Sequence, residues 1–103
     1  MDQQKYKILL SYDILNTESD AYYRFMLGKF VPVLQNQGLT NFEAWHTAYG
    51  DYPVRLVSFT ANSYDDVQDL FATARWNKLE TRLNEFVTNY EMRVVPVDGQ
   101  FHF

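Results

Sequence analysis

The sequence predicts an α+β fold in which strands and helices follow one another in the order βαββαβ. Residues 41–61 form two runs rich in β-branched and aromatic residues around a Gly-Asp-Tyr-Pro cluster at 50–53, a pattern typical of a β-hairpin. A helical pattern and a further strand-like run stand on each side of this hairpin. The order is that of a ferredoxin-like domain, a four-stranded antiparallel sheet with its helices on one face.

Composition favours one globular domain that spans residues 1–103. Of these residues 47% are hydrophobic and 17% aromatic, which supplies a substantial core. The net charge of −4, with no run of one sign, disfavours nucleic acid and membranes as partners. The chain has no cysteine, so disulfides and thiolate chemistry are excluded. The first apolar run, Ile8 to Leu10, is too short for a signal peptide, and we expect a cytoplasmic protein.

The first half of the chain contains a strand and a long helix. Residues 6–14 alternate between two faces, as a strand requires. From about residue 20 to 37, apolar residues recur at spacings of three and four, which predicts a helix. Gly38 is a left-handed stop at its end, and Pro32 inside it predicts a kink or a loosened turn.

The second helical pattern, residues 62–87, predicts a helix that is broken in two. Apolar residues in the stretch 67–74 form one stripe, and those in the stretch 79–87 form another, about 120° around the helix. One straight helix cannot turn both stripes to the core, so we predict a break near Arg75 and Trp76. A last strand, 90–97, is followed by a turn and an aromatic tail, 100–103, which we expect to dock on protein.

Neither strand of the hairpin has a wholly polar face, which indicates a sheet covered on both sides. Two helices from a chain this short cover only one face. We therefore expect a homodimer in which a second subunit covers the other face of the sheet.

Several residues resemble a known superfamily over nearly the whole chain. The run Phe30-Val31-Pro32-Val33-Leu34 leads to Gly38, Trp45 stands in a strand, Gly50 at the hairpin, and Arg75-Trp76 in the broken helix. This arrangement resembles the dimeric α/β-barrel superfamily, within it the NIPSNAP-type and antibiotic-biosynthesis monooxygenase-like proteins. The resemblance implies a dimer whose two sheets pair face to face into a barrel. Because the superfamily includes cofactor-free oxygenases, haem-degrading enzymes, isomerases and proteins of unknown role, it implies no single activity.

The sequence offers little for metal, haem or nucleophilic chemistry. The only histidines are His46, in a strand, and His102, in the tail, whereas haem-degrading relatives place their iron ligand on a helix. Glu43 lies three residues from His46 and so faces the other side of the strand. No serine stands in a Gly-x-Ser-x-Gly setting, and no glycine-rich phosphate loop occurs. We expect no metal and no cofactor.

The remaining hypothesis is a pocket between sheet and helices that takes a small hydrophobic or aromatic ligand. His46 is the candidate catalytic residue, since histidine titrates near neutrality and can exchange a proton. The candidate substrate-binding residues are Tyr12 as a hydroxyl donor, Trp45 and Trp76 as stacking surfaces, and Arg55 as an anion clamp or an interface ion pair. Trp45 and His46 are adjacent and face opposite sides of the sheet. An ordinary packing role stays open for each residue.

The functions that fit are those of a binding protein for aromatic or polyketide-like molecules, or of a cofactor-independent oxygenase-like or isomerase-like enzyme. The alternative is a non-catalytic ligand-sensing or dimerisation module, which needs no further catalytic residues. An RNA-binding version of the topology is disfavoured, because strand 54–61 lacks the glycine-containing basic and aromatic motif of that class.

Overall fold

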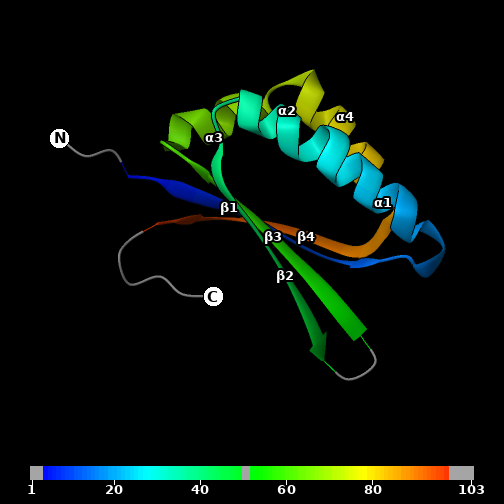
Figure 1. Cartoon of the computed structure of the whole chain (residues 1–103). Helices are drawn as coiled ribbons and strands as arrows, with labels where there is room; N and C mark the ends of the chain where they lie inside the picture. Colours follow the sequence, from blue (N-terminus) through cyan, green and yellow to red (C-terminus); the bar gives the residue numbers. More distant parts are fainter. Residues whose placement is uncertain (1–3, 50–51, 98–103) are drawn as a thin grey trace.

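The computed structural model describes residues 4–49 and 52–97, which form one antiparallel sheet and one helical layer. The sheet has four strands in the order β2-β3-β1-β4, and the helices lie together on one of its faces (Figure 1). This is the predicted ferredoxin-like fold. The strands are β1 (Tyr6–Ile14), β2 (Thr40–Tyr49), β3 (Tyr52–Ala61) and β4 (Val87–Pro96). The helical segments are η1 (Asn16–Glu18), α1 (Ser19–Phe25), η2 (Met26–Phe30), α2 (Val31–Asn36), α3 (Tyr64–Phe71) and α4 (Ala74–Leu83).

The first helical region is continuous but changes its winding before Pro32. Segment η2 is a π-helical turn, in which the backbone N–H of Val31 donates to the carbonyl of Met26. A proline removes one hydrogen bond and its ring crowds the carbonyl four residues earlier, and the wider π turn relieves that crowding. The predicted loosened turn therefore takes this form. Gly38 follows the helix with a φ of +94°, which confirms the predicted left-handed stop.

The second helical region is broken, as the phase of its two apolar stripes predicts. The break lies between Phe71 and Ala74, slightly earlier than predicted. Thr73 determines its position: its Oγ1 accepts a hydrogen bond of 3.1 Å from the N–H of Trp76 and donates one of 2.7 Å to the carbonyl of Leu70. The threonine thus begins α4 as an N-cap while it closes α3.

Strand β4 begins at Val87, three residues before the predicted start. Phe86 and Val87 are buried, as their apolar pattern indicates, but they follow the helix instead of ending it. The pairing of β4 with β1 shifts register near Asn89, which has a φ of +56° and donates a 2.8 Å hydrogen bond to Asp13. The aromatic tail, residues 100–103, lies outside the described residues.

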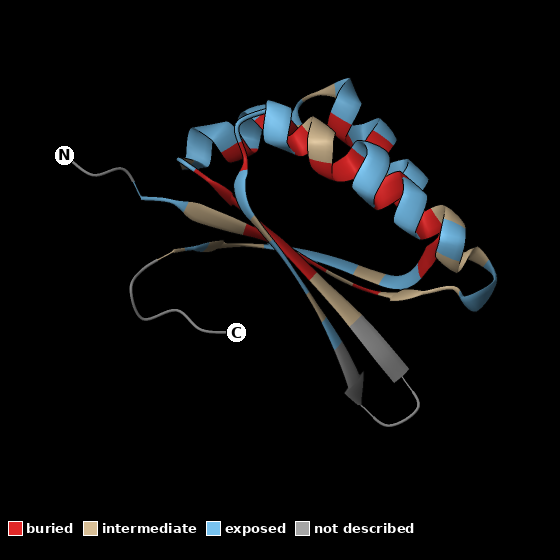
Figure 2. Cartoon of the chain, viewed as in Figure 1, coloured by how far each residue is buried: buried red, intermediate tan, exposed pale blue. Residues whose placement is uncertain are grey.

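The core fills the space between the helices and one face of the sheet, where buried residues of both layers meet (Figure 2). On the sheet this face carries Ile8, Leu10, Tyr12, Val57, Phe59 and Ala61. We call the opposite side the outer sheet face. It carries the partly buried Leu9, Trp45 and Leu56 together with the buried Ser58. Among the described helices, none is long and apolar enough to cross a lipid bilayer.

Candidate functional site

One rung of the sheet brings together three of the residues that the sequence singles out. Arg55 on β3 is paired with Tyr12 on β1 and with His46 on β2. Directly paired residues of antiparallel strands share a face, and Tyr12 is part of the buried core. All three side chains therefore belong to the face that the helices cover.

A small pocket opens at this rung. Its volume is about 140 Å³, and it lies between the sheet and the segment that leads into α1. We call it the His46 pocket. The residues that line it are Ile14, Asn16, Ser19, Tyr23, His46 and Arg55.

Arg55 supplies a positive charge that its surroundings leave partly unsatisfied. Its guanidinium carbon lies 5.4 Å from the centre of the Tyr23 ring, a cation–π contact. Its Nε atom is buried and has no hydrogen-bond partner among the described residues. None of the described residues that line the pocket is acidic. A buried donor on a cation without a carboxylate nearby favours the binding of an anion.

Behind the pocket, two tyrosine hydroxyls form a hydrogen bond in the core. The hydroxyl oxygens of Tyr12 and Tyr22 are 2.5 Å apart, and the rings meet edge to face with centres 5.7 Å apart. Burial raises the pKa of Tyr12, and the neighbouring Tyr22 raises it further. Burial also raises the pKa of Tyr22, whereas its hydrogen bond with Tyr12 and the charge of Arg55 act to lower it. The charge of Arg55 acts to lower the pKa of both tyrosines, so the hydroxyl pair is coupled electrostatically to the pocket.

The structure separates the two tryptophans from this site. Trp45 precedes His46 on β2 and belongs to the outer sheet face. Trp76 is only 3% exposed and packs in the core, where its ring centre lies 6.0 Å from that of Phe30 and 5.1 Å from that of Phe71. Neither tryptophan lines the His46 pocket, and a role for either in substrate binding stays a prediction.

Five lining or neighbouring residues, including Ile14 of β1, were not singled out as site residues from the sequence. The apolar stripe predicted for the first helix includes Tyr22 and Tyr23. The turn and the cap predicted before that helix include Asn16 and Ser19. Two consecutive tyrosines at a helix start were the one sequence signal for this site, because both cannot face the core. In the structure Tyr23 is 38% exposed, and its ring contacts Arg55.

Within residues 4–49 and 52–97, no three His, Cys, Asp or Glu side chains gather as a metal site requires.

Solved structures with the same architecture cover nearly the whole chain. A hydroxynitrile lyase from Passiflora edulis matches with a TM-score of 0.78 and 7% identity, covering 96% of this chain and 98% of that one. The cofactor-independent oxygenase SnoaB from Streptomyces nogalater, in a mutant form, matches with a TM-score of 0.73 and 9% identity, covering 94% and 95%. A NIPSNAP family protein from Agrobacterium tumefaciens matches with a TM-score of 0.67 and 16% identity, covering 98% and 92%.

Further neighbours are another NIPSNAP domain protein and two proteins described as putative antibiotic biosynthesis monooxygenases. The fold is the one these proteins share. The resemblance drawn from the sequence is therefore confirmed at the level of architecture. No protein-family model matches the sequence, and no curated protein sequence does. At identities this low the likeness establishes the fold and leaves the activity to the site.

Proposed function

We propose that the His46 pocket binds a small organic molecule with an acidic hydroxyl group and that His46 takes up its proton. The observation that carries this proposal is the buried Nε of Arg55, which has no hydrogen-bond partner among the described residues, none of whose pocket-lining members is acidic. A phenolate or enolate oxygen supplies both the acceptor and the negative charge that Arg55 lacks. His46 lines the same pocket and is exposed, so it can pass the proton to solvent.

The volume of the pocket limits the substrate to about one ring. Ligand pockets for drug-sized molecules usually measure roughly 300–1,000 Å³. The His46 pocket, at about 140 Å³, is less than half of the lower limit. Among the ligands expected from the sequence, a single-ring phenol suits the pocket better than a multi-ring polyketide.

The reaction that we propose is a cofactor-independent oxygenation, and the similarity in fold to SnoaB supports it. His46 removes a proton from the hydroxyl group, and Arg55 holds the resulting anion. The electron-rich anion then reduces O₂, so that one oxygen atom enters the substrate and the other leaves as water with two of the substrate's hydrogens. The substrate itself supplies the electrons, and no added reductant is needed.

Binding of 4-nitrophenol, whose ionised form has its own absorbance band, tests the part that we assign to Arg55. We expect the protein to lower the pKa of the bound phenol, because Arg55 stabilises the phenolate. Replacing Arg55 by methionine removes a charged hydrogen bond worth about 1.5–3 kcal/mol, so affinity for the phenolate should fall roughly 10- to 100-fold.

Arg24→Met is the matched control, because Arg24 is an exposed arginine on α1 that does not line the His46 pocket. Its affinity for 4-nitrophenolate should equal that of the unmodified protein. Equal affinity for 4-nitrobenzyl alcohol and 4-nitrophenolate, or an Arg55→Met variant that binds as well as Arg24→Met, would contradict the proposed anion site.

We also propose that a second copy of the chain covers the outer sheet face. Leu9, Trp45 and Leu56 are partly exposed there, so their apolar surface remains available to a partner. The buried hydroxyl oxygen of Ser58 has no hydrogen-bond partner among the described residues and lies on the same face. Burial of these side chains against a second sheet removes apolar area from water.

Native mass spectrometry tests this interface. The unmodified protein should be a dimer at micromolar concentration, and Leu56→Glu should shift it to the monomer by placing a charge in the interface. Leu27→Glu is the control, since Leu27 is 66% exposed in the helical layer. A monomeric unmodified protein, or a dimer that survives Leu56→Glu but not Leu27→Glu, would contradict the proposed interface.

A further inference from the structure

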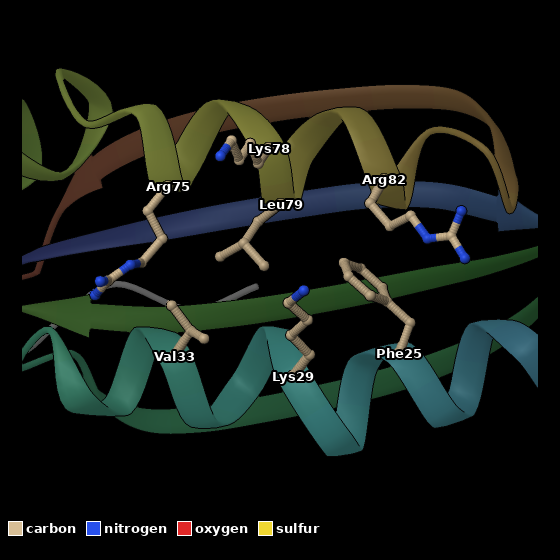
Figure 3. Close-up of a pocket in the computed structure, with 7 residues that line it drawn as sticks. All are labelled: Phe25, Lys29, Val33, Arg75, Lys78, Leu79 and Arg82. Carbon is tan, nitrogen blue, oxygen red and sulfur yellow. The ribbon is translucent and has the colours of Figure 1, made fainter.

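A second hollow lies in the helical layer, between the first helical region and α4 (Figure 3). We call it the helix groove. Its volume is about 320 Å³, and it shares no lining residue with the His46 pocket. Phe25, Val33 and Leu79 point toward one another between the helices, with Lys29 among them and Arg75 and Arg82 toward the two ends. Lys78 completes the lining.

The helix groove concentrates positive charge in an acidic protein. The chain carries 13 acidic and nine basic residues, and four of these nine line the groove, where no acidic residue stands among the described lining residues. Arg82 forms an ion pair of 3.0 Å with Glu85. Within the described part of the chain, Lys29, Arg75 and Lys78 form no ion pair.

This arrangement works against the stability of the isolated fold. Arg75, Lys78 and Arg82 follow one another at spacings of three and four on α4, where like charges repel. Lys29 faces them from the other side of the groove. Positive potential of this kind is focused by low-dielectric walls and favours an anion. A bound anion would offset the repulsion between these side chains, because each of them attracts it.

We propose that the helix groove binds an anionic amphiphile, a molecule with one negatively charged head and a short apolar tail. The tail would contact Phe25, Val33 and Leu79, and the head would contact the cations on either side. The methylene stems of lysine and arginine can cover the tail while their charged ends meet the head.

The size of the groove selects a small molecule over a helix of a partner protein. Arg75 and Arg82 are seven residues apart on α4, which is about 10 Å along the helix axis. An α-helix with its side chains is about 10–12 Å thick and needs a longer apolar trough for successive anchors. A volume of about 320 Å³ lies at the lower end of the range for small-molecule sites.

Decanoate, at concentrations below those at which it forms micelles, is the probe. Backbone amide NMR shifts on titration should change at residues of η2 and α4 and saturate. We expect Arg75→Gln/Lys78→Gln to weaken the binding of decanoate at least tenfold. Decanol, which has the same tail without the charge, should bind at least tenfold more weakly than decanoate to the unmodified protein.

Lys5→Gln/Arg24→Gln is the matched control, because it removes two positive charges at exposed positions that do not line the groove. Its affinity for decanoate should stay within twofold of that of the unmodified protein. No saturable shifts with decanoate, equal binding of decanol, or an equal loss in both double variants would overturn the proposal. If Arg75→Gln/Lys78→Gln dissociated a dimer of the protein, the groove would be a contact with a second copy. If only an acidic peptide, and not decanoate, changed the amide shifts of the groove, the groove would bind a protein partner.

Discussion

Replacing Trp76 by alanine is expected to lower the free energy of unfolding by about 3–5 kcal/mol. The indole is 3% exposed and packs against Phe30 and Phe71. Its loss therefore leaves a cavity in the core beside these two rings. Because folded proteins are only marginally stable, such a loss is a large share of the total free energy of unfolding. Urea denaturation followed by fluorescence of Trp45, or by circular dichroism, measures it.

Leu27→Ala is the control for this experiment, because Leu27 is a helical residue that is 66% exposed. Its free energy of unfolding should change by less than about 0.5 kcal/mol apart from helix propensity. If Trp76→Ala lowered the free energy of unfolding by less than about 1 kcal/mol and also weakened the binding of 4-nitrophenol, Trp76 would be a substrate contact and not a core residue.

Replacing His46 by glutamine is expected to lower the turnover of the oxygenation that we propose by about 10²- to 10⁴-fold, the usual contribution of a general base. Glutamine keeps the size and hydrogen-bonding capacity of the side chain but cannot take up a proton near neutral pH. His46 is exposed, so the free energy of unfolding should change by less than about 0.5 kcal/mol. The measurement is O₂ uptake with hydroquinone as a single-ring substrate, corrected for uncatalysed oxidation.

Glu43→Gln provides the control, since Glu43 is an exposed residue on the opposite face of the same strand. Its turnover should match that of the unmodified protein. If His46→Gln turned over hydroquinone as fast as Glu43→Gln, His46 would not be the base. Binding of 4-nitrophenol through Arg55 without any O₂ uptake would identify the pocket as that of a ligand-sensing module.

The sequence predicts most of the fold because local patterns and core packing agree. Strand 6–14 has the predicted bounds, since its alternation coincides with a sheet face that is buried. The break in the second helical region follows from the phase of two apolar stripes, although Thr73 moves it toward the N-terminus. The early start of β4 was missed, because buried Phe86 and Val87 fit a helical stripe as well as a strand.

The candidate site was only partly predictable, because it depends on register between strands. His46 and Arg55 belong to strands whose pairing is set by the hairpin connection, and the composition of the two strands does not state which residues are paired. Tyr22 and Tyr23 carry both apolar area and a hydroxyl group, so a periodic pattern cannot distinguish a core residue from one that faces a charge. Their positions relative to Arg55 required the tertiary structure.

The π-helical turn at Met26–Phe30 also bears on how this chain should be aligned with its relatives. Such a turn holds one residue more than the α-helical turn that it replaces. Relatives with an uninterrupted helix would therefore align with a one-residue gap within this segment, and apolar positions before and after it would follow separate helical phases. An alignment that forces a single phase through the region would exchange buried and exposed positions on one side, and Phe25 or Phe30 would then be compared with surface residues.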